Sequence, residues 1–138
     1  MENSQNLEKE LYQFRFMKEQ LEFTQSQYEI FNAALSNLLM IKTTLENIRD
    51  NVQENEEILI PIGGLISIRA TIKDTKKLLL YVSQDTVIEK SFDESVVFID
   101  KQIEQSKEQL QLLGETIQKL QLNVEGMGQS LQNKMGKQ

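Results

Sequence analysis

The chain of 138 residues has no cysteine, no histidine and no tryptophan, and it has only one proline and six glycines. Without cysteine or histidine it cannot form a disulfide, a Cys/His zinc site, a thiol nucleophile or a Ser-His-Asp triad. Carboxylates are therefore the only groups left for metal binding or acid–base chemistry. So little proline and glycine is atypical of a fold with many tight turns, and it favours long helices that each carry a narrow apolar stripe.

Basic clusters and long apolar runs are also missing. The net charge of −6 is spread along the chain, and no segment is basic. Nucleic acid binding needs a concentrated cationic surface, so we expect no nucleic acid partner, and anionic membrane surfaces are disfavoured for the same reason. No apolar run approaches the roughly 20 residues that span a bilayer, and the acidic N-terminal residues do not resemble a secretory signal. We expect a soluble, cytoplasmic protein without membrane contact.

Two stretches predict long helices. Residues 7–52 contain no glycine or proline, and their apolar residues recur at alternating spacings of three and four, the heptad pattern of a coiled coil. Residues 91–135 repeat the pattern, and Ser91 followed by Glu94 predicts a capped helix start. A narrow stripe must be buried against another helix, and the two helices are nearly equal in length. We therefore expect an antiparallel two-helix coiled coil with both chain ends at one tip.

The middle of the chain, residues 53–90, predicts four short strands in two β-hairpins at the end opposite the termini. Its first part is rich in isoleucine with period-two alternation, Gly63-Gly64 predicts a turn, and Pro61 is expected at an edge or bulge. As one four-stranded sheet, this insertion has an apolar face that no helix of the chain covers, and two open edges. We expect the sheets of several chains to close into an oligomeric β-barrel platform. The residues expected to make this contact are Ile60, Ile62, Ile66, Ile68, Ile72, Leu78 and Leu80.

The tip formed by the chain ends carries more large apolar residues than a two-helix seam can bury. On the second helix, methionines alternate there with Gly126, Gly128 and Gly136, and each glycine inside a helix costs roughly 1 kcal/mol relative to alanine. One interpretation is a frayed helix end, and the other is a flexible apolar surface that adapts to varied non-native proteins. On the second interpretation the client-binding residues are Leu7, Leu11, Phe14, Met17, Met127, Leu131 and Met135.

The helix register can be predicted from the same pattern. If the helices pair around residues 52 and 91, Met17 faces Gly126. A glycine opposite a large side chain leaves the seam underfilled. We therefore expect the tip to exchange between paired and splayed forms.

The acidic residues could be taken for a reactive site. Glu56-Glu57 and Asp93-Glu94 are adjacent carboxylates, which a magnesium site or a general acid would use. Adjacent carboxylates do not converge unless the fold brings in others, so a solvated turn and a helix N-terminus are the plainer interpretations. We expect no enzyme activity, no cofactor and no metal.

The motifs of the middle segment resemble those of prefoldin, in its alpha class. They are LIPIGG at 59–64, IKDTKKLLL at 72–80 and VIEKSFDES at 87–95, and with the flanking helices the resemblance covers nearly the whole chain. The second hairpin marks the alpha class. The turn of that hairpin usually holds glycines in this class, whereas residues 81–85 here are YVSQD.

The fold expected on these grounds is mostly α with a small β insertion. It is a single domain over residues 1–138, with helices at 1–52 and 91–138 and the hairpins at 53–90. The resemblance implies an archaeal-type subunit that forms a heterohexamer of two alpha and four beta subunits. It further implies an ATP-independent holdase that binds unfolded client proteins at the coiled-coil tips and passes them to a group II chaperonin. The alternative is a coiled-coil scaffold or tether without general client binding.

Overall fold

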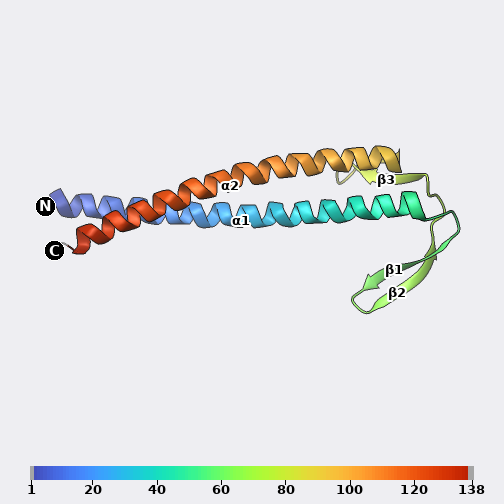
Figure 1. The fold of residues 1–138 in the computed structure, drawn as a ribbon, viewed down its shortest axis with the longest axis horizontal. Coiled ribbons are helices and arrows are strands. Elements are labelled where there is room, and N and C mark those ends of the chain that lie inside the picture. Colours follow the sequence, from blue (N-terminus) through green and yellow to red (C-terminus); the bar gives the residue numbers. More distant parts are fainter. Residues whose placement is uncertain (1, 137–138) are drawn as a thin grey trace. The chain divides into compact units, whose positions relative to one another are not determined.

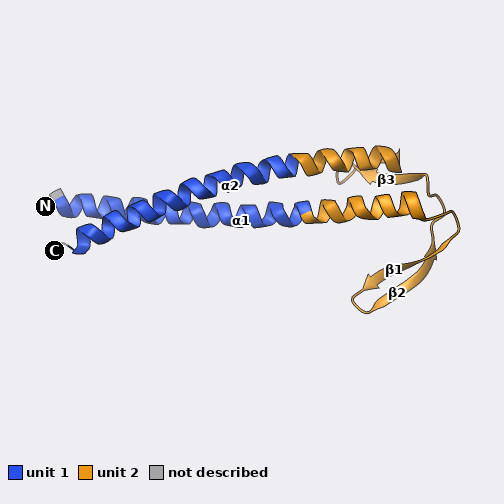
Figure 2. Ribbon diagram, viewed as in Figure 1, with its two compact units in different colours: residues 1–35, 105–138 blue, residues 36–104 orange. Residues whose placement is uncertain are grey.

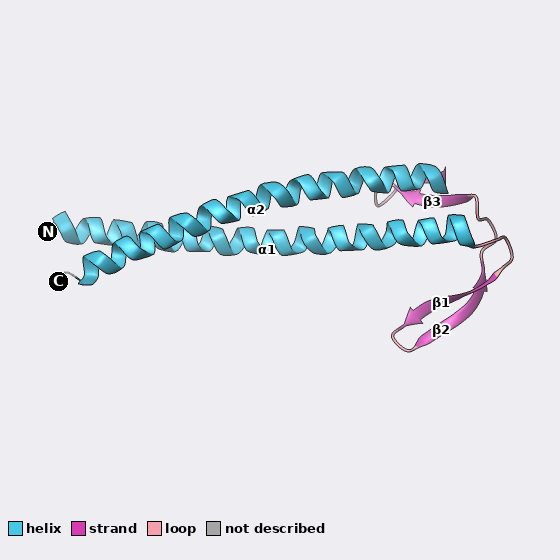
Figure 3. Ribbon diagram, viewed as in Figure 1, coloured by secondary structure: helices cyan, strands magenta, loops and turns pink. Residues whose placement is uncertain are grey.

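The computed structural model describes residues 2–136, which form two helices with a small strand insertion between them (Figures 1 and 3). The chain divides into two compact units, which are described separately: unit 1 holds residues 1–35 and 105–138, and unit 2 holds residues 36–104 (Figure 2). Neither helix, over the described residues, combines the length and apolarity that a membrane crossing requires. The elements in chain order are α1 (Glu2–Asn51), β1 (Glu57–Gly63), β2 (Ile66–Thr71), β3 (Lys77–Tyr81), β4 (Val87–Ser91) and α2 (Phe92–Gly136).

Unit 1 pairs the first part of α1 with the last part of α2 in antiparallel orientation. Phe14 lies against Gly128 and Tyr28 against Gly114, which places the register within one residue of the predicted one. The predicted heptad rows form the seam, because nearly all of their side chains in unit 1 are half-buried or buried while most of their neighbours are exposed. The exceptions are Phe31, which is 37% exposed, and Lys134. Glu10 also forms an ion pair with Lys134 across the seam.

Unit 2 contains the best-buried part of the seam. The first four turns of α2 supply four of the six buried apolar side chains among the described residues. They are Phe92, Val96, Ile99 and Ile103. These four side chains lie on the apolar heptad rows of the second helix, so their burial follows from the sequence pattern.

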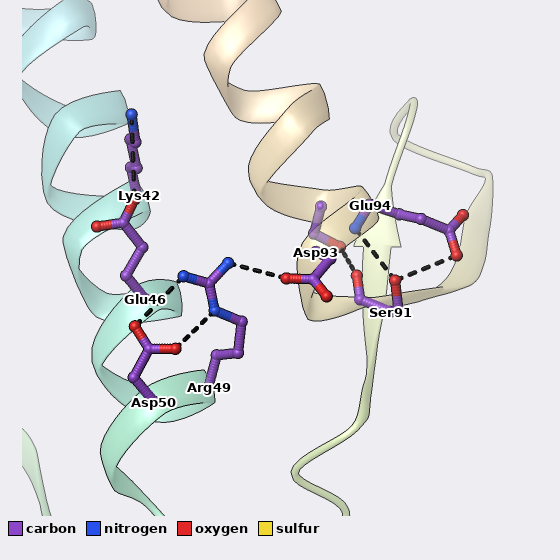
Figure 4. Close-up of polar contacts among 8 residues, drawn as sticks. Lys42, Glu46, Arg49, Asp50, Ser91, Asp93 and Glu94 are labelled. Carbon is purple, nitrogen blue, oxygen red and sulfur yellow. Dashed lines mark hydrogen bonds and ion pairs between the residues drawn. The ribbon is translucent and has the colours of Figure 1, made fainter.

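Two ion pairs cross the seam of unit 2 where basic residues interrupt the apolar row of α1. Lys42 Nζ lies 2.7 Å from Asp100 Oδ1. Arg49 Nη1 lies 2.9 Å from Asp93 Oδ1 (Figure 4). The hydrogen bond to Asp100 raises the pKa of Lys42, and hydrogen bonds to Asp50 and Asp93 raise the pKa of Arg49. The pairs are seven residues apart on both helices, so both hold the same register.

The first hairpin pairs β1 with β2, and Ile60 lies opposite Ile68. The register shifts between Pro61 and Gly63, so the proline lies at a bulge, as predicted. Side chains alternate along a strand, and Ile58 therefore shares a face with this isoleucine pair.

The second hairpin, β3 with β4, forms a sheet of its own, and the structure shows no pairing between the two hairpins over residues 2–136. The prediction of one four-stranded sheet is therefore wrong. The physical reason lies between β2 and β3, where the Asp74 carboxylate accepts the N–H groups of Lys76 (2.8 Å) and Lys77 (3.1 Å). This wide turn replaces a two-residue hairpin loop and starts β3 away from β2. The same bonds lower the pKa of Asp74.

The turn between β3 and β4 forms without glycine. The Val82 N–H donates to the Thr86 carbonyl oxygen at 3.0 Å, and no residue of this turn has a positive φ. Among the described residues, Asn55, between α1 and β1, is the one non-glycine residue with a positive φ, which is 65°. Asparagine tolerates this left-handed conformation better than most residues, and its N–H donates to the Ile72 carbonyl oxygen.

The start of α2 is capped as predicted. The Ser91 hydroxyl oxygen accepts the Glu94 N–H at 3.1 Å and the hydroxyl donates to Glu94 Oε1 at 3.1 Å (Figure 4). The Lys90 ammonium lies 3.2 Å from Glu94 Oε2. The hydrogen bonds from Lys90 and from the Ser91 hydroxyl lower the pKa of Glu94. The Phe92 N–H donates to the Lys76 carbonyl oxygen, which ties the second hairpin to the beginning of α2.

Candidate functional site

A groove of about 480 Å³ opens on the seam of unit 1, near the end where α1 begins and α2 ends. Its apolar walls come from both helices, and its polar rim comes from Glu125, Gln129 and Gln132 of α2. The apolar residues that line it are Leu11, Phe14, Leu131 and Met135. The groove is apolar at its floor and polar at its edge, as surfaces that bind apolar chain segments are.

A second groove, of about 370 Å³, lies on the same seam. Phe16 and Met17 of α1 and Met127 of α2 supply its apolar lining, with Gln13 and Asn123 beside them. Methionine has a flexible, polarizable side chain that fits surfaces of varied shape. Two methionines from opposite helices therefore give this groove an adaptable floor.

The predicted client-binding residues lie along this seam, and most are partly covered. Six of the seven are half-buried or buried, with Leu131 only 5% exposed, whereas Met135 is 58% exposed. All except Leu7 line one of the two grooves. In the paired form of the helices, the grooves expose these residues only in part. Their role in client binding stays a prediction.

Gly128 is a functional candidate that the sequence analysis did not single out. A Cβ at Gly128 would lie 3.4 Å from Phe14 Cε2, whereas a Cβ at Gly126 would have nothing within 4 Å. Near the chain ends, the glycine that faces a large side chain is therefore Gly128 against Phe14, and the predicted pairing of Met17 with Gly126 is not the close one. The one-residue shift in register explains the difference.

The predicted assembly residues lie on the two hairpins. In this single chain Ile60, Ile62, Ile66 and Ile68 are exposed. The other three, Ile72, Leu78 and Leu80, are half-buried. The exposed isoleucines of the first hairpin form an apolar face that no described residue of the chain covers fully. Their role in assembly also stays a prediction.

The opposite faces of the hairpins also carry exposed apolar side chains, which the sequence analysis missed. Four large side chains outside the predicted set are exposed there and at the first turn: Leu59, Leu65, Leu79 and Tyr81. The signal was present, because residues 58–62 are an unbroken apolar run rather than an alternating one. Such runs are typical of strands that are covered on both faces.

The two carboxylate pairs do not converge on one site. Glu57 pairs with Arg69 at 3.5 Å, and Asp93 pairs with Arg49. Glu56 Oε2 accepts the Gln53 N–H at 2.9 Å, and Glu94 caps α2. Each carboxylate thus has a structural partner of its own. No group of three or more acidic side chains within residues 2–136 is placed to hold a metal ion.

Comparison with known proteins decides the family. Residues 17–137, most of the chain, match the sequence profile of the family described as Prefoldin subunit. The chain belongs to the prefoldin family. Prefoldin subunit alpha of Pyrococcus horikoshii is 25% identical over 137 residues, which cover 99% of this chain and 93% of that protein. Prefoldin subunit alpha of Methanococcus aeolicus is 26% identical over 140 residues, which cover 96% of this chain and 94% of that protein. The chain is thus an alpha-class prefoldin subunit with archaeal relatives.

Solved prefoldin structures share the fold. The filamentous PFD of Methanocaldococcus jannaschii superimposes with a TM-score of 0.70 at 19% identity, covering 84% of this chain and 95% of that one. The prefoldin beta subunit of Thermococcus strain KS-1 superimposes with a TM-score of 0.60 at 15% identity, covering 93% and 90%. Two long helices with antiparallel hairpins between them are therefore the prefoldin arrangement, and the predicted fold is confirmed.

Proposed function

We propose that this prefoldin subunit is part of a cytoplasmic, ATP-independent holdase that keeps non-native proteins from aggregating. The observation that carries the proposal is the pair of apolar grooves on the seam of unit 1. Their linings offer apolar surface and lack the residues of a reactive site. Family membership makes the chain a chaperone-related subunit. The grooves add a surface of the right chemistry, which is apolar, methionine-bearing and rimmed mainly by amide side chains.

Assembly occurs through the hairpins in this proposal. The exposed isoleucine face of β1 and β2 would be costly to leave in water, since each buried isoleucine contributes roughly 1.5–3 kcal/mol. Hairpins of several chains close into a β-barrel platform, which also pairs their open edges. The partner is a beta-class prefoldin subunit, and the assembly is a heterohexamer of two alpha and four beta subunits.

Client binding is weak at each subunit and strong only for the assembly. A groove that receives a few apolar side chains gains roughly 1.5–3 kcal/mol for each, before the entropy of ordering the client is subtracted. Several such surfaces on one platform raise the overall affinity without any new kind of contact. Weak individual contacts also allow the client to be passed on, and we propose a group II chaperonin as the recipient.

The test is to titrate the assembled protein into several unrelated, chemically denatured proteins and to follow aggregation by light scattering. We expect protection of most of them, without ATP and in the presence of EDTA. A coiled-coil scaffold or tether recognises one defined partner, so protection of none or only one of the denatured proteins would favour that alternative. Loss of protection in EDTA would show that the acidic residues bind a metal that holding requires.

A further inference from the structure

Three methionines line the two grooves of unit 1. The chain has five methionines, of which Met1 lies outside the described residues. Met17 and Met127 line the second groove, and Met135 lines the first. Met40 belongs to unit 2 and lines neither of these grooves. The grooves therefore hold three of the four described methionines, each as part of their apolar lining.

The sulfur atoms of these methionines are accessible to a small oxidant. The sequence has no cysteine, so a peroxide meets no competing thiol. Met135 is 58% exposed, and Met17 and Met127 are half-buried in a groove that opens to solvent. A small oxidant can therefore reach all three sulfur atoms while the helices stay paired.

Each groove also carries amide side chains next to its methionines. They are Gln13 and Asn123 in the second groove, and Gln129 and Gln132 in the first. An amide NH2 group supplies two hydrogen-bond donors, whereas a thioether sulfur is only a weak acceptor. Oxidation to the sulfoxide adds a polar oxygen that can accept these bonds. The grooves thus offer partners for the oxidised side chains.

From this arrangement we infer that Met17, Met127 and Met135 form a reversible oxidation site, at which a peroxide switches client binding off. This inference rests on the proposed holdase function and adds a regulation of the same grooves. In the reaction the peroxide O–O bond breaks, and one oxygen forms a bond to the thioether sulfur. The sulfur gives up two electrons, and the other peroxide oxygen leaves as water. Polar sulfoxides then replace the apolar floor that receives client side chains.

The buried packing of the chain does not depend on these methionines. The buried apolar side chains among the described residues are phenylalanine, valine, isoleucine and leucine, and no methionine is among them. Oxidation therefore changes the groove surface and leaves the buried part of the seam in place. Methionine sulfoxide reductases return the sulfoxide to the thioether, so the change is reversible.

The test uses the full chain assembled with a beta-class prefoldin subunit, treated with hydrogen peroxide and then with catalase. The probe is fluorescently labelled α-lactalbumin, reduced and carboxymethylated so that it stays unfolded, and binding is followed by anisotropy. The groove variant is Met17→Leu/Met127→Leu/Met135→Leu, since leucine has a similar volume and lacks the sulfur. The matched control is Met40→Leu, because Met40 is 68% exposed and lies outside both grooves. The beta subunit is the same in every sample, so a difference between variants comes from this chain.

The measured quantity is the ratio of the dissociation constants after and before treatment, taken within each variant. We expect a ratio of about ten for the wild type and for Met40→Leu, and of no more than about two for the groove variant. Helical content and native mass are expected to stay constant, and sulfoxide reductases are expected to restore the affinity of the wild type. Equal ratios in the groove variant and the wild type would overturn the inference. Loss of helix on treatment, or an affinity that stays low after the sulfoxides are reduced, would also overturn it.

Failure of the holdase proposal gives a different result. An untreated wild-type assembly that does not bind the probe would overturn that proposal, and the switch with it. An untreated assembly that binds the probe, and binds it equally well after all four methionines are oxidised, would overturn the switch alone.

A second measurement decides the matter if the groove variant does not assemble. In a time course of peroxide treatment of the wild type, peptide mass spectrometry gives the oxidised fraction of each methionine. We expect the affinity to fall as positions 17, 127 and 135 are oxidised. A fall in affinity that follows position 40 alone would contradict the inference.

Discussion

At the scale of single residues, Gly128 lies against Phe14 on the seam of unit 1. A Cβ at that position would lie 3.4 Å from Phe14 Cε2, which is van der Waals contact. Gly126, two residues earlier, has no such neighbour within 4 Å. The two glycines therefore carry the same cost in helix propensity, but only one of them shapes the groove.

Replacing each glycine by alanine separates these effects. Gly128→Ala and Gly126→Ala both gain roughly 1 kcal/mol of helix propensity, so we expect both to raise the melting temperature. Only the methyl group at position 128 partly fills the groove beside Phe14. We expect Gly128→Ala alone to weaken the binding of a denatured client, as measured by anisotropy. Equal losses of affinity would show that fraying of the helix end, rather than the groove, governs binding.

Asp74 gives the turn before β3 a dependence on pH. Because two backbone N–H bonds lower its pKa, the folded turn favours the ionised carboxylate. Its contribution to stability is complete above the ordinary carboxyl pKa of about 4 and is lost as the pH falls through the lowered value. We expect the amide resonances of Lys76 and Lys77 to shift in one acidic step.

Asp74→Asn is the test of that assignment. Asparagine keeps an oxygen that can accept both bonds but does not titrate, so we expect the acidic step at Lys76 and Lys77 to disappear. Asp85→Asn, in the turn between β3 and β4, is the matched control and is expected to leave the step in place. A step that survives Asp74→Asn would assign the pH dependence to another group.

At the scale of elements, the sequence predicts what local periodicity encodes. Heptad spacing fixes both helices and their antiparallel pairing, and the Ser91 cap and the Pro61 bulge follow from the chemistry of single residues. Pairing between hairpins depends on the direction of the connection at Asp74, which no periodicity encodes. The ion-pair partners of Lys42 and Arg49 could not be predicted from the sequence either, because a contact across the seam depends on the register to within one residue.

The sequence predicted the candidate site about as well as it predicted the fold. Six of the seven proposed client residues line the grooves, and four of the six lie on the predicted heptad rows, because seam and grooves share the same face of each helix. The exposed side chains of Leu59, Leu79 and Tyr81 on the opposite faces of the hairpins needed exposed fractions to be recognised. A sequence shows that large side chains are in excess, but it does not show which of them remain in contact with water.

In the proposed assembly, the contact between chains depends on the isoleucine face of the first hairpin. Ile68→Asp would bury a carboxylate without a partner in any packed interface, which costs several kcal/mol. We expect this variant not to join an assembly with a beta-class subunit, while its helical circular dichroism stays near that of the wild type. Ser67→Asp is the matched control, because the neighbouring residue lies on the other face of β2. Loss of assembly in both variants would point to the charge itself rather than to the isoleucine face.

At the scale of the whole molecule, the proposed assembly and client-binding roles belong to different units. The hairpins of unit 2 expose the apolar side chains that we propose for assembly, and the seam of unit 1 carries the grooves that we propose for clients. The two roles use different residues, so they can be removed separately. This separation is what a holdase built from several weak surfaces requires, because each subunit must be anchored while its binding surface stays free.

The most direct test of this division is one measurement on one sample: native mass and client protection of the assembly after residues 1–14 and 127–138 are deleted. The deletion removes Phe14, Gly128, Leu131 and Met135, and with them the first groove, but it leaves every strand intact. We predict a mass that corresponds to the same number of subunits, together with loss of most of the protection of denatured proteins. Full protection by the shortened assembly would contradict the account and would place client binding elsewhere in the molecule.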